Sequence, residues 1–259
     1  MNWWHQKWKR RAFLGSLPFA ALGLAVAEAK YVEPEWLKVT HLKLNKGPNP
    51  FKVVHLTDIH YKGNRAYLEK VVEKINTLEA DYVLFTGDLI EEASYLEEAV
   101  DILESIKPPI IAVAGNHDHW SGATMPQFRK KFASIGAAWL EDQAVTLKGG
   151  KLTIYGDSCL RRPSLQPTGE GTEILLMHYP GRVDFLKGMK YSLMLAGHSH
   201  GGQVRIPLYG PIVLPAGVGK YDLGLFETES GPLYVSAGIG WFYMNFRFNC
   251  RPEIALIEI

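Results

Sequence analysis

The stretch IIAVAGNHD, residues 110–118, indicates the fold class, because an apolar strand ends there in a run of polar residues. The apolar part stops before Gly115, and Asn116, His117 and Asp118 follow the glycine. An ordinary turn needs only a glycine and one Asn or Asp. The sequence therefore indicates a strand that delivers an amide, an imidazole and a carboxylate to a site at its end.

Two earlier segments repeat this pattern. FKVVHLTDIH (51–60) and YVLFTGD (82–88) are short apolar strands that end in polar residues. Apolar residues at helical spacing predict helices in the intervals, over 68–78, 96–103 and 128–135. A strand–helix–strand–helix–strand order predicts crossover units and a parallel sheet.

The second half of the chain contains short apolar runs with few helical intervals, which predicts a second sheet. A hairpin is expected to turn at Gly149 and Gly150. Further strands are expected in EILLMH, SLMLAGH, GQVRI, LGLFET, LYVSA and EIALIEI. The fold class expected for the whole chain is α/β, with two packed mixed β-sheets flanked by helices.

Residues 1–27 have the composition of an export signal. A basic, aromatic start is followed by the apolar run 12–27, which ends in Ala-Val-Ala, the order typical of a secretory signal. RRAFL (10–14) also resembles a twin-arginine signal. The run is shorter than the roughly 20 apolar residues of a membrane span. We expect export, or membrane anchoring, through residues 1–27 with the export machinery as a partner, then a lead-in strand region at 28–50 and one domain at 51–259.

Composition limits the partners and the redox chemistry. The 259 residues are 47% hydrophobic and 21% charged, enough for one substantial domain with a buried core. A net charge of +1 provides no bulk attraction to nucleic acid, so no specific nucleic-acid binding is expected. The two cysteines, Cys159 and Cys250, are too few for a disulfide framework, and the sequence leaves open whether they pair.

Chemically active residues follow strands throughout the chain. Loops at the carboxyl ends of strands bind ligands in α/β sheets, so we expect these side chains to form one site. They are Asp58, His60, Asp88, Asn116, His117, Asp118, His178, His198 and His200. Carboxylates combined with imidazoles suit Mn, Fe or Zn. Two such ions about 3.5–4 Å apart share a carboxylate and suit in-line attack on phosphorus.

Five sequence blocks resemble those of the calcineurin-like metallophosphoesterase family, from about residue 51 to the C-terminus. In order, they are Asp58-x-His60, Gly87-Asp88, Gly115-Asn116-His117-Asp118, His178 and Gly197-His198-Ser199-His200. The part after GHSHGGQVRIPLYG is similar to a bacterial branch of exported or membrane-associated members. That branch includes phosphodiesterases with twin-arginine signals and is related to the UDP-2,3-diacylglucosamine pyrophosphatases. The resemblance implies an α/β/β/α metallophosphoesterase sandwich.

The resemblance also implies a role for each site residue. The first of two divalent metal ions would be held by Asp58, His60, Asp88 and His200. The second would share Asp88 and add Asn116, His178 and His198. His117 would protonate the leaving oxygen without binding metal, and Asp118 would orient His117. A hydroxide bridging the two ions would attack phosphorus in line.

The implied function is metal-dependent hydrolysis of a phosphoester, above all a phosphodiester, outside the cytoplasm or at the membrane surface. One alternative is UDP-2,3-diacylglucosamine pyrophosphatase activity in lipid A biosynthesis, although the cytoplasmic enzymes of that type carry Arg at the position of His117. A second alternative is a non-catalytic binding protein on the same fold. The complete set of metal ligands argues against that alternative.

Other residues carry weaker expectations. His55 is expected to be a satisfied core histidine, and His119 to lie in a solvated loop. Five arginines could meet phosphate oxygens but are also explained as surface charge: Arg161, Arg162, Arg205, Arg247 and Arg251. The aromatic run 241–243, with Phe246 and Phe248, is expected to pack in the core or rim rather than line a lipid groove.

Overall fold

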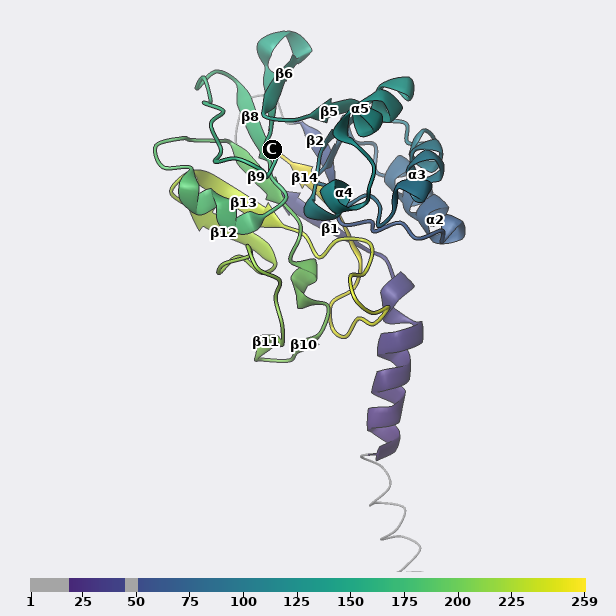
Figure 1. The fold of residues 1–259 in the computed structure, drawn as a ribbon. Coiled ribbons are helices and arrows are strands. Elements are labelled where there is room, and N and C mark those ends of the chain that lie inside the picture. Colours follow the sequence, from purple (N-terminus) through teal and green to yellow (C-terminus); the bar gives the residue numbers. More distant parts are fainter. Residues whose placement is uncertain (1–18, 45–50) are drawn as a thin grey trace, which may run out of the picture.

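A computed structural model describes residues 19–44 and 51–259, and two β-sheets form the body of the chain (Figure 1). The first sheet has the order β1-β14-β2-β3-β4-β5. Its strands are β1 (Lys38–Lys43), β14 (Glu253–Glu258), β2 (Lys52–Leu56), β3 (Tyr82–Phe85), β4 (Ile110–Val113) and β5 (Ala138–Leu140). Strands β2 to β5 are parallel, as predicted, and β14 is antiparallel to β2 and parallel to β1.

Three helices cover the outer face of this sheet. They are α2 (Arg65–Asn76), α3 (Leu96–Leu103) and α5 (Met125–Ser134). Their apolar faces pack against outward-pointing residues of β2 to β4, such as Val54 and Phe85. The predicted helical spacing is therefore confirmed. Thr124 is the N-cap residue of α5, and its backbone N–H donates to the Gln127 side chain in a capping box.

The second sheet has the order β12-β13-β9-β8-β7-β6. Its strands are β12 (Gly224–Thr228), β13 (Gly231–Val235), β9 (Leu193–Ala196), β8 (Thr172–Leu176), β7 (Leu152–Gly156) and β6 (Gln143–Leu147). The four inner strands are parallel, and the β6–β7 hairpin turns through Lys148–Gly150, as predicted. The strand expected in GQVRI shortens to β10 (Arg205–Ile206), which pairs with β11 (Gly210–Pro211) in a separate hairpin.

The two sheets pack face to face through alternate residues of their strands. Val53 and Ile111 from the first sheet meet Ile154 and Leu195 from the second in one buried cluster. The outer face of the second sheet is covered by the short helix η4 (Pro180–Phe185) and loops. The predicted architecture of two mixed sheets flanked by helices is thus confirmed.

His55 lies buried in β2, as expected for a core histidine. Its Nε2 lies 2.8 Å from the Thr86 hydroxyl. Burial lowers its pKa to about 3, so the ring is neutral near pH 7. His119 differs from expectation, because it lies partly buried on the short helix α4 (Asn116–Trp120) rather than in a loop.

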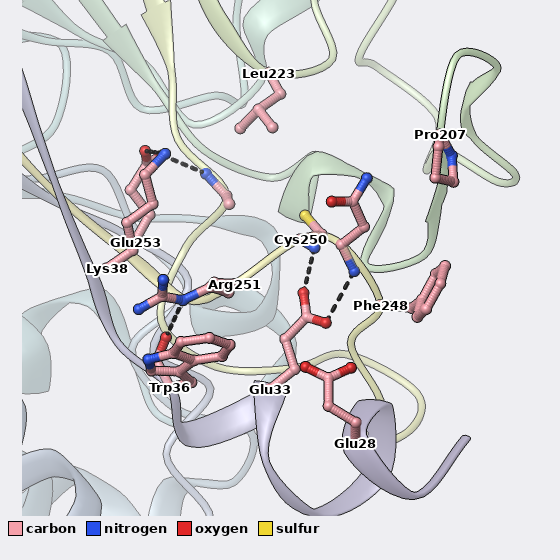
Figure 2. A pocket seen from close by; sticks show the side chains of 12 residues that line it. Glu28, Glu33, Trp36, Lys38, Pro207, Leu223, Phe248, Cys250, Arg251 and Glu253 are labelled. Carbon is pink, nitrogen blue, oxygen red and sulfur yellow. Dashed lines mark hydrogen bonds and ion pairs between the residues drawn. The ribbon is translucent and has the colours of Figure 1, made fainter. Parts of the chain in front are cut away.

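Residues 19–31 form a helix that projects away from the sheets (Figure 1). Its base is tied to the C-terminal part of the chain, where Glu33 accepts backbone N–H bonds from Asn249 and Cys250 (Figure 2). Among residues 19–44 and 51–259, no helix is long and apolar enough to cross a membrane. The signal predicted over 1–27 falls largely on residues 1–18, outside the described residues. Cys159 and Cys250 are both free, so the disulfide that the sequence left open is not formed.

Candidate metal centre

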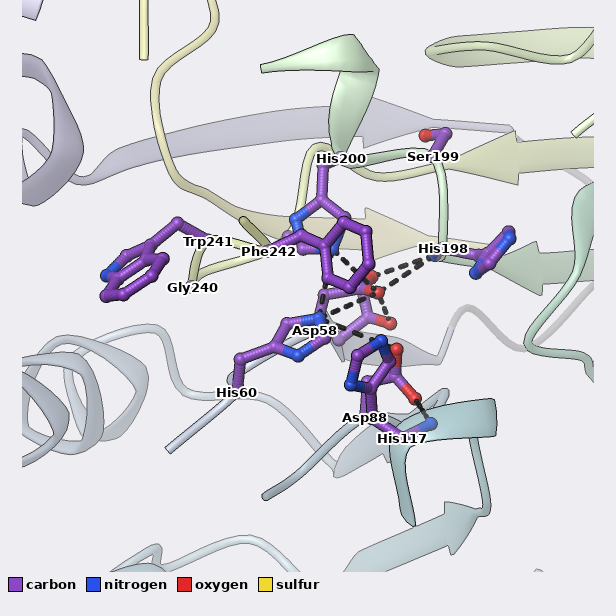
Figure 3. A network of polar contacts seen from close by, with 12 residues as sticks. Asp58, His60, Asp88, His117, His198, Ser199, His200, Gly240, Trp241 and Phe242 are labelled. Atoms are coloured by element: carbon purple, nitrogen blue, oxygen red, sulfur yellow. Dashed lines mark hydrogen bonds and ion pairs between the residues drawn. The ribbon is translucent and has the colours of Figure 1, made fainter. Parts of the chain in front are cut away.

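The seven residues expected to bind metal meet at the carboxyl ends of strands from both sheets. Each follows its strand by two to four residues: Asp58 and His60 after β2, Asp88 after β3, Asn116 after β4, His178 after β8, and His198 and His200 after β9. All seven are buried. Figure 3 shows several of these side chains converging with His117 on one point.

Three of them form a first group of ligand atoms. Nε2 of His60 lies 3.0 Å from Nε2 of His200, and Oδ1 of Asp58 lies 3.5 Å from the same His200 nitrogen. The Asp58 carboxylate is held in place by the backbone N–H of His198, at 3.0 Å, and by the Thr57 hydroxyl, at 2.8 Å. The group therefore presents two ring nitrogens and one carboxylate oxygen to a common point.

A second group lies on the other side of Asp88. Nδ1 of His178 donates to the Thr86 carbonyl and Nε2 of His198 to the Ala216 carbonyl, which fixes both tautomers. In the neutral rings, the opposite nitrogens carry lone pairs, yet they face each other at 3.1 Å. The Asn116 side-chain oxygen lies 2.9 Å from the same His178 nitrogen. Such a cluster of lone pairs is suited to a cation.

Asp88 joins the two groups. Its Oδ2 lies 3.5 Å from Nε2 of His60 and 3.3 Å from Nε2 of His178. Its Oδ1 accepts the backbone N–H of His117 at 2.8 Å, so the other oxygen is directed between the two sets of imidazoles. The ligand atoms of Asp58, His60 and His200 lie within 4.8 Å of one another, as do those of Asp88, His178 and His198. Their mixture of imidazole and carboxylate suits divalent cations.

The backbone around these residues is strained. Five of the seven expected ligands have left-handed φ angles, between 46° and 66°: Asp58, His60, Asp88, His198 and His200. Non-glycine residues adopt this region rarely, and such strain concentrates at functional sites. Close packing adds to the constraint, since a Cβ on Gly115 would lie 2.1 Å from Oδ1 of Asp88.

The carboxylates attract positive charge to this point. Burial, together with nearby His178, lowers the pKa of His198 to about 3, so the ring is neutral and able to bind metal. Burial acts in the same direction on His178, but Asp88 and Asp58 outweigh it and raise that pKa to about 9. A metal ion at this site takes the place of such a proton, so the two compete.

The structure corrects the predicted role of Asp118. Its carboxylate accepts backbone N–H bonds from Asp88 at 2.8 Å, Leu89 at 2.8 Å and Gly115 at 2.9 Å, and it therefore shapes the loops that carry the ligands. Its position inside this turn leaves no carboxylate oxygen for the His117 ring. Asp118 thus supports the two loops instead of orienting His117.

Glu91 holds the His117 ring instead, and the sequence analysis missed it. Its Oε2 lies 3.0 Å from Nδ1 of His117, and its Oε1 contacts Nδ1 of His60. His117, which was expected not to bind metal, lies with His60 and Asp88 in a third group whose ligand atoms are within 4.8 Å of one another and could hold a metal ion. The signal in the sequence was the position of Glu91 three residues after Asp88, in the same loop.

Three of the arginines considered for phosphate binding contact parts of the protein other than the expected metal ligands. Arg205 pairs with Asp222, and Arg251 donates to the carbonyls of Trp36 and Leu37. Arg247 is fully buried and donates to the carbonyls of Cys250, Ala237, Gly238 and Gly240. None of the five arginines lines the cavity that opens beside Asp88 and His117.

Comparison with known proteins agrees with this geometry. Residues 51–202 match the family model described as Calcineurin-like phosphoesterase. The chain belongs to this family. Its Asp and His side chains lie in groups that could hold a metal ion, and this phosphoesterase is a metal-dependent hydrolase of phosphoesters.

Several relatives are similar over most of the chain. The uncharacterized metallophosphoesterase YkuE of Bacillus subtilis is 29% identical, over 98% of both chains. The Escherichia coli phosphodiesterase YaeI is 29% identical, over 88% of this chain and 90% of the relative. The Chlamydia trachomatis UDP-2,3-diacylglucosamine pyrophosphatase LpxG is 25% identical, over 89% and 91%. Among solved structures, TT1561 of Thermus thermophilus has a TM-score of 0.50 at 12% identity, over 74% of this phosphoesterase and 91% of that chain, and shares the fold.

Proposed function

We propose that this phosphoesterase hydrolyses phosphodiesters with two divalent metal ions, one on each side of Asp88. The observation that carries the proposal is the position of Oδ2 of Asp88 between Nε2 of His60 and Nε2 of His178. Asp58, His60 and His200 would complete one site, and Asn116, His178 and His198 the other. Mn, Fe and Zn all suit this mixture of ligands.

Bound metal ions supply Lewis acidity and make a water molecule more acidic near neutral pH. The residues of the chain position the ester and handle its leaving group. Glu91 holds Nδ1 of His117 at 3.0 Å, and no described residue accepts a hydrogen bond from Nε2 of that ring. The imidazolium can therefore donate its Nε2 proton to the oxygen of a leaving alcohol or phosphate.

Preference for a diester follows from the charge around the cavity beside His117. This cavity has a volume of about 190 Å³, and among the described residues that line it there is no Arg or Lys. A monoester dianion exposes three terminal oxygens and favours extra cations beside the metals, whereas a diester carries one negative charge. The site as built therefore matches the diester.

The test compares 4-nitrophenyl phosphate with bis(4-nitrophenyl) phosphate on protein reloaded with Mn. The expected result is a higher kcat/KM for the diester. A higher kcat/KM for the monoester would overturn the preference, and stoichiometric loading with one metal ion per chain at saturation would overturn the two-metal proposal.

A second candidate activity is cleavage of the pyrophosphate bond in UDP-2,3-diacylglucosamine. Its support is the similarity to LpxG over most of both chains. His117 suits this reaction too, because the leaving group is a phosphate oxygen. Including UDP-2,3-diacylglucosamine in the same substrate panel decides between the two activities by their kcat/KM values.

We further propose that the protein is exported, or anchored to the membrane, through residues 1–27. The support is the sequence of that segment, with Arg10 and Arg11 ahead of its apolar run. Replacing both arginines with lysine should retain the protein in the cytoplasm in cell fractionation. Unchanged export would exclude the twin-arginine route.

A further inference from the structure

A second cavity adjoins the metal centre, and its walls are apolar. It has a volume of about 380 Å³, within the range of small-molecule sites. Its apolar lining includes Val204, Ile212, Val213, Phe242, Met244 and Phe246. Three residues, His200, Pro215 and Phe242, line both this cavity and the one beside Asp88 and His117. A molecule with its phosphate at the metal centre can therefore extend directly into the apolar cavity.

Phe242 lies at the junction between the two cavities. Its ring centroid lies 4.9 Å from that of His117 and 6.3 Å from that of His60. Figure 3 shows the ring of Phe242 among the side chains of the metal centre. The aromatic run that was expected to pack in the core or rim thus contributes a wall next to the chemistry.

Two polar side chains in the wall, those of Gln203 and Ser199, already form hydrogen bonds within the protein. The Gln203 amide donates to the carbonyls of Met244 and Phe246, at 3.1 and 3.0 Å, and its oxygen accepts the N–H of Phe242 at 2.9 Å. The Ser199 hydroxyl accepts the N–H of Gly201. These groups fix the loop that shapes the cavity and offer little to a polar ligand, so the cavity selects an apolar one.

The mouth of the cavity is apolar as well. Val213 is 71% exposed, Tyr243 83% and Met244 66%. The β10–β11 hairpin, which leads into Ile212, also exposes Leu208 and Tyr209. Apolar side chains gathered beside an active site are typical of a ligand-binding surface.

We propose that this cavity binds the hydrocarbon chain of an amphiphilic phosphodiester whose phosphate lies at the metal centre. The proposal rests on the phosphodiesterase function proposed above and assigns its substrate class. An alcohol esterified to phosphorus carries a linear apolar chain, which passes Phe242 and lies against Val213 and Met244.

The kinetic test uses a series of 4-nitrophenyl alkyl phosphates with methyl, butyl and octyl groups. Each methylene group that becomes fully buried is worth up to roughly a fourfold gain in binding. We expect kcat/KM to rise at least about tenfold from methyl to octyl. In the double variant Val213→Ser/Met244→Ser, the octyl-to-methyl ratio should fall at least about fivefold. Leu225→Ser, a matched control at a partly exposed leucine on β12 outside the cavity lining, should keep the wild-type ratio.

A binding measurement separates this inference from the proposed activity. Octylphosphonate and methylphosphonate contain no ester bond, so calorimetry on Mn-loaded protein reports binding without turnover. Tighter binding of octylphosphonate, lost in the double variant, supports the cavity assignment even if no diester is hydrolysed. Equal affinity for the two phosphonates would overturn the cavity assignment. So would an octyl-to-methyl ratio of kcat/KM that is the same in the wild type and the double variant. If all diesters are hydrolysed with the same kcat/KM whatever the chain length, the cavity assignment is wrong, but the proposed phosphodiesterase function still stands.

Discussion

Oε2 of Glu91 lies 3.0 Å from Nδ1 of His117, and the other oxygen of the same carboxylate contacts the His60 ring. One side chain thus links the residue expected to protonate the leaving group with a residue expected to bind metal. Burial acts against charge at both partners. For Glu91, the hydrogen bonds from His117 and His60 outweigh burial and hold its pKa well below the usual range. For His117, burial lowers the pKa, but the Glu91 hydrogen bond and the negative charges of Asp88 and Glu91 together outweigh burial and raise it.

Glu91→Gln should shift the alkaline limb of the pH profile to lower pH. The carboxylate raises the pKa of His117, so the imidazolium persists to higher pH in the wild type. If the imidazolium is the acid, activity is present below its pKa and lost above it. Removal of the negative charge lowers the pKa of His117, so the enzyme loses activity at a lower pH than the wild type does. The measurement is kcat/KM against pH, with the exposed neighbour variant Glu92→Gln as the control, and an unmoved alkaline limb would contradict the role.

His117→Ala should retain metal and lose turnover. General acid catalysis contributes roughly 10²–10⁴-fold, so the loss on an alkyl diester should fall in that range. On bis(4-nitrophenyl) phosphate the loss should be smaller, because nitrophenolate leaves without protonation. Equal losses on both substrates, with the metal content unchanged, would argue against the acid role.

Asp88→Asn should reduce metal occupancy on both sides of the site. The carboxylate oxygen faces the imidazoles of both groups, and a neutral amide attracts divalent cations far less strongly. Metal analysis after reloading should therefore show less than one ion per chain, whereas Asp101→Asn, on an exposed face of α3, should match the wild type. Two ions per chain in Asp88→Asn would be incompatible with a bridging role.

Arg247→Met should destabilise the fold. The buried guanidinium donates to four backbone carbonyls, and its removal leaves those acceptors without partners. We expect a decrease of about 3 kcal/mol in the free energy of unfolding, measured by denaturant titration. The control Arg129→Met removes an exposed ion pair with Glu141 and should change the free energy of unfolding by less than about 1 kcal/mol. Similar values for the two variants would refute the structural role of Arg247.

The gathering of the candidate metal ligands could be predicted because each follows a buried strand that is visible in the sequence. His178 directly follows the apolar run of β8, and parallel strands bring such positions to one edge. Glu91 and Arg247 could not be placed in this way. Their partners are a ring from another loop and a set of backbone carbonyls, and no periodic pattern encodes such contacts. The same holds for Asp118. Its carboxylate oxygens accept backbone N–H groups, and no pattern in the sequence indicates those partners.

The insertion of β14 between β1 and β2 has a consequence for folding. The last strand of the chain fills the gap between two of the earliest, with Lys38 paired to Glu253 and Leu256 to Val54. The first sheet is therefore complete only once residues 253–258 have paired, and such pairing of distant segments slows folding. Glu253 on β14 also accepts the backbone N–H of Ala237. Two residues further on, the N–H of Ile239 donates to the carbonyl of Thr57, which precedes the expected ligand Asp58. A chain in which β14 has not paired thus lacks this support for its candidate metal site, which couples catalytic competence to closure of the first sheet.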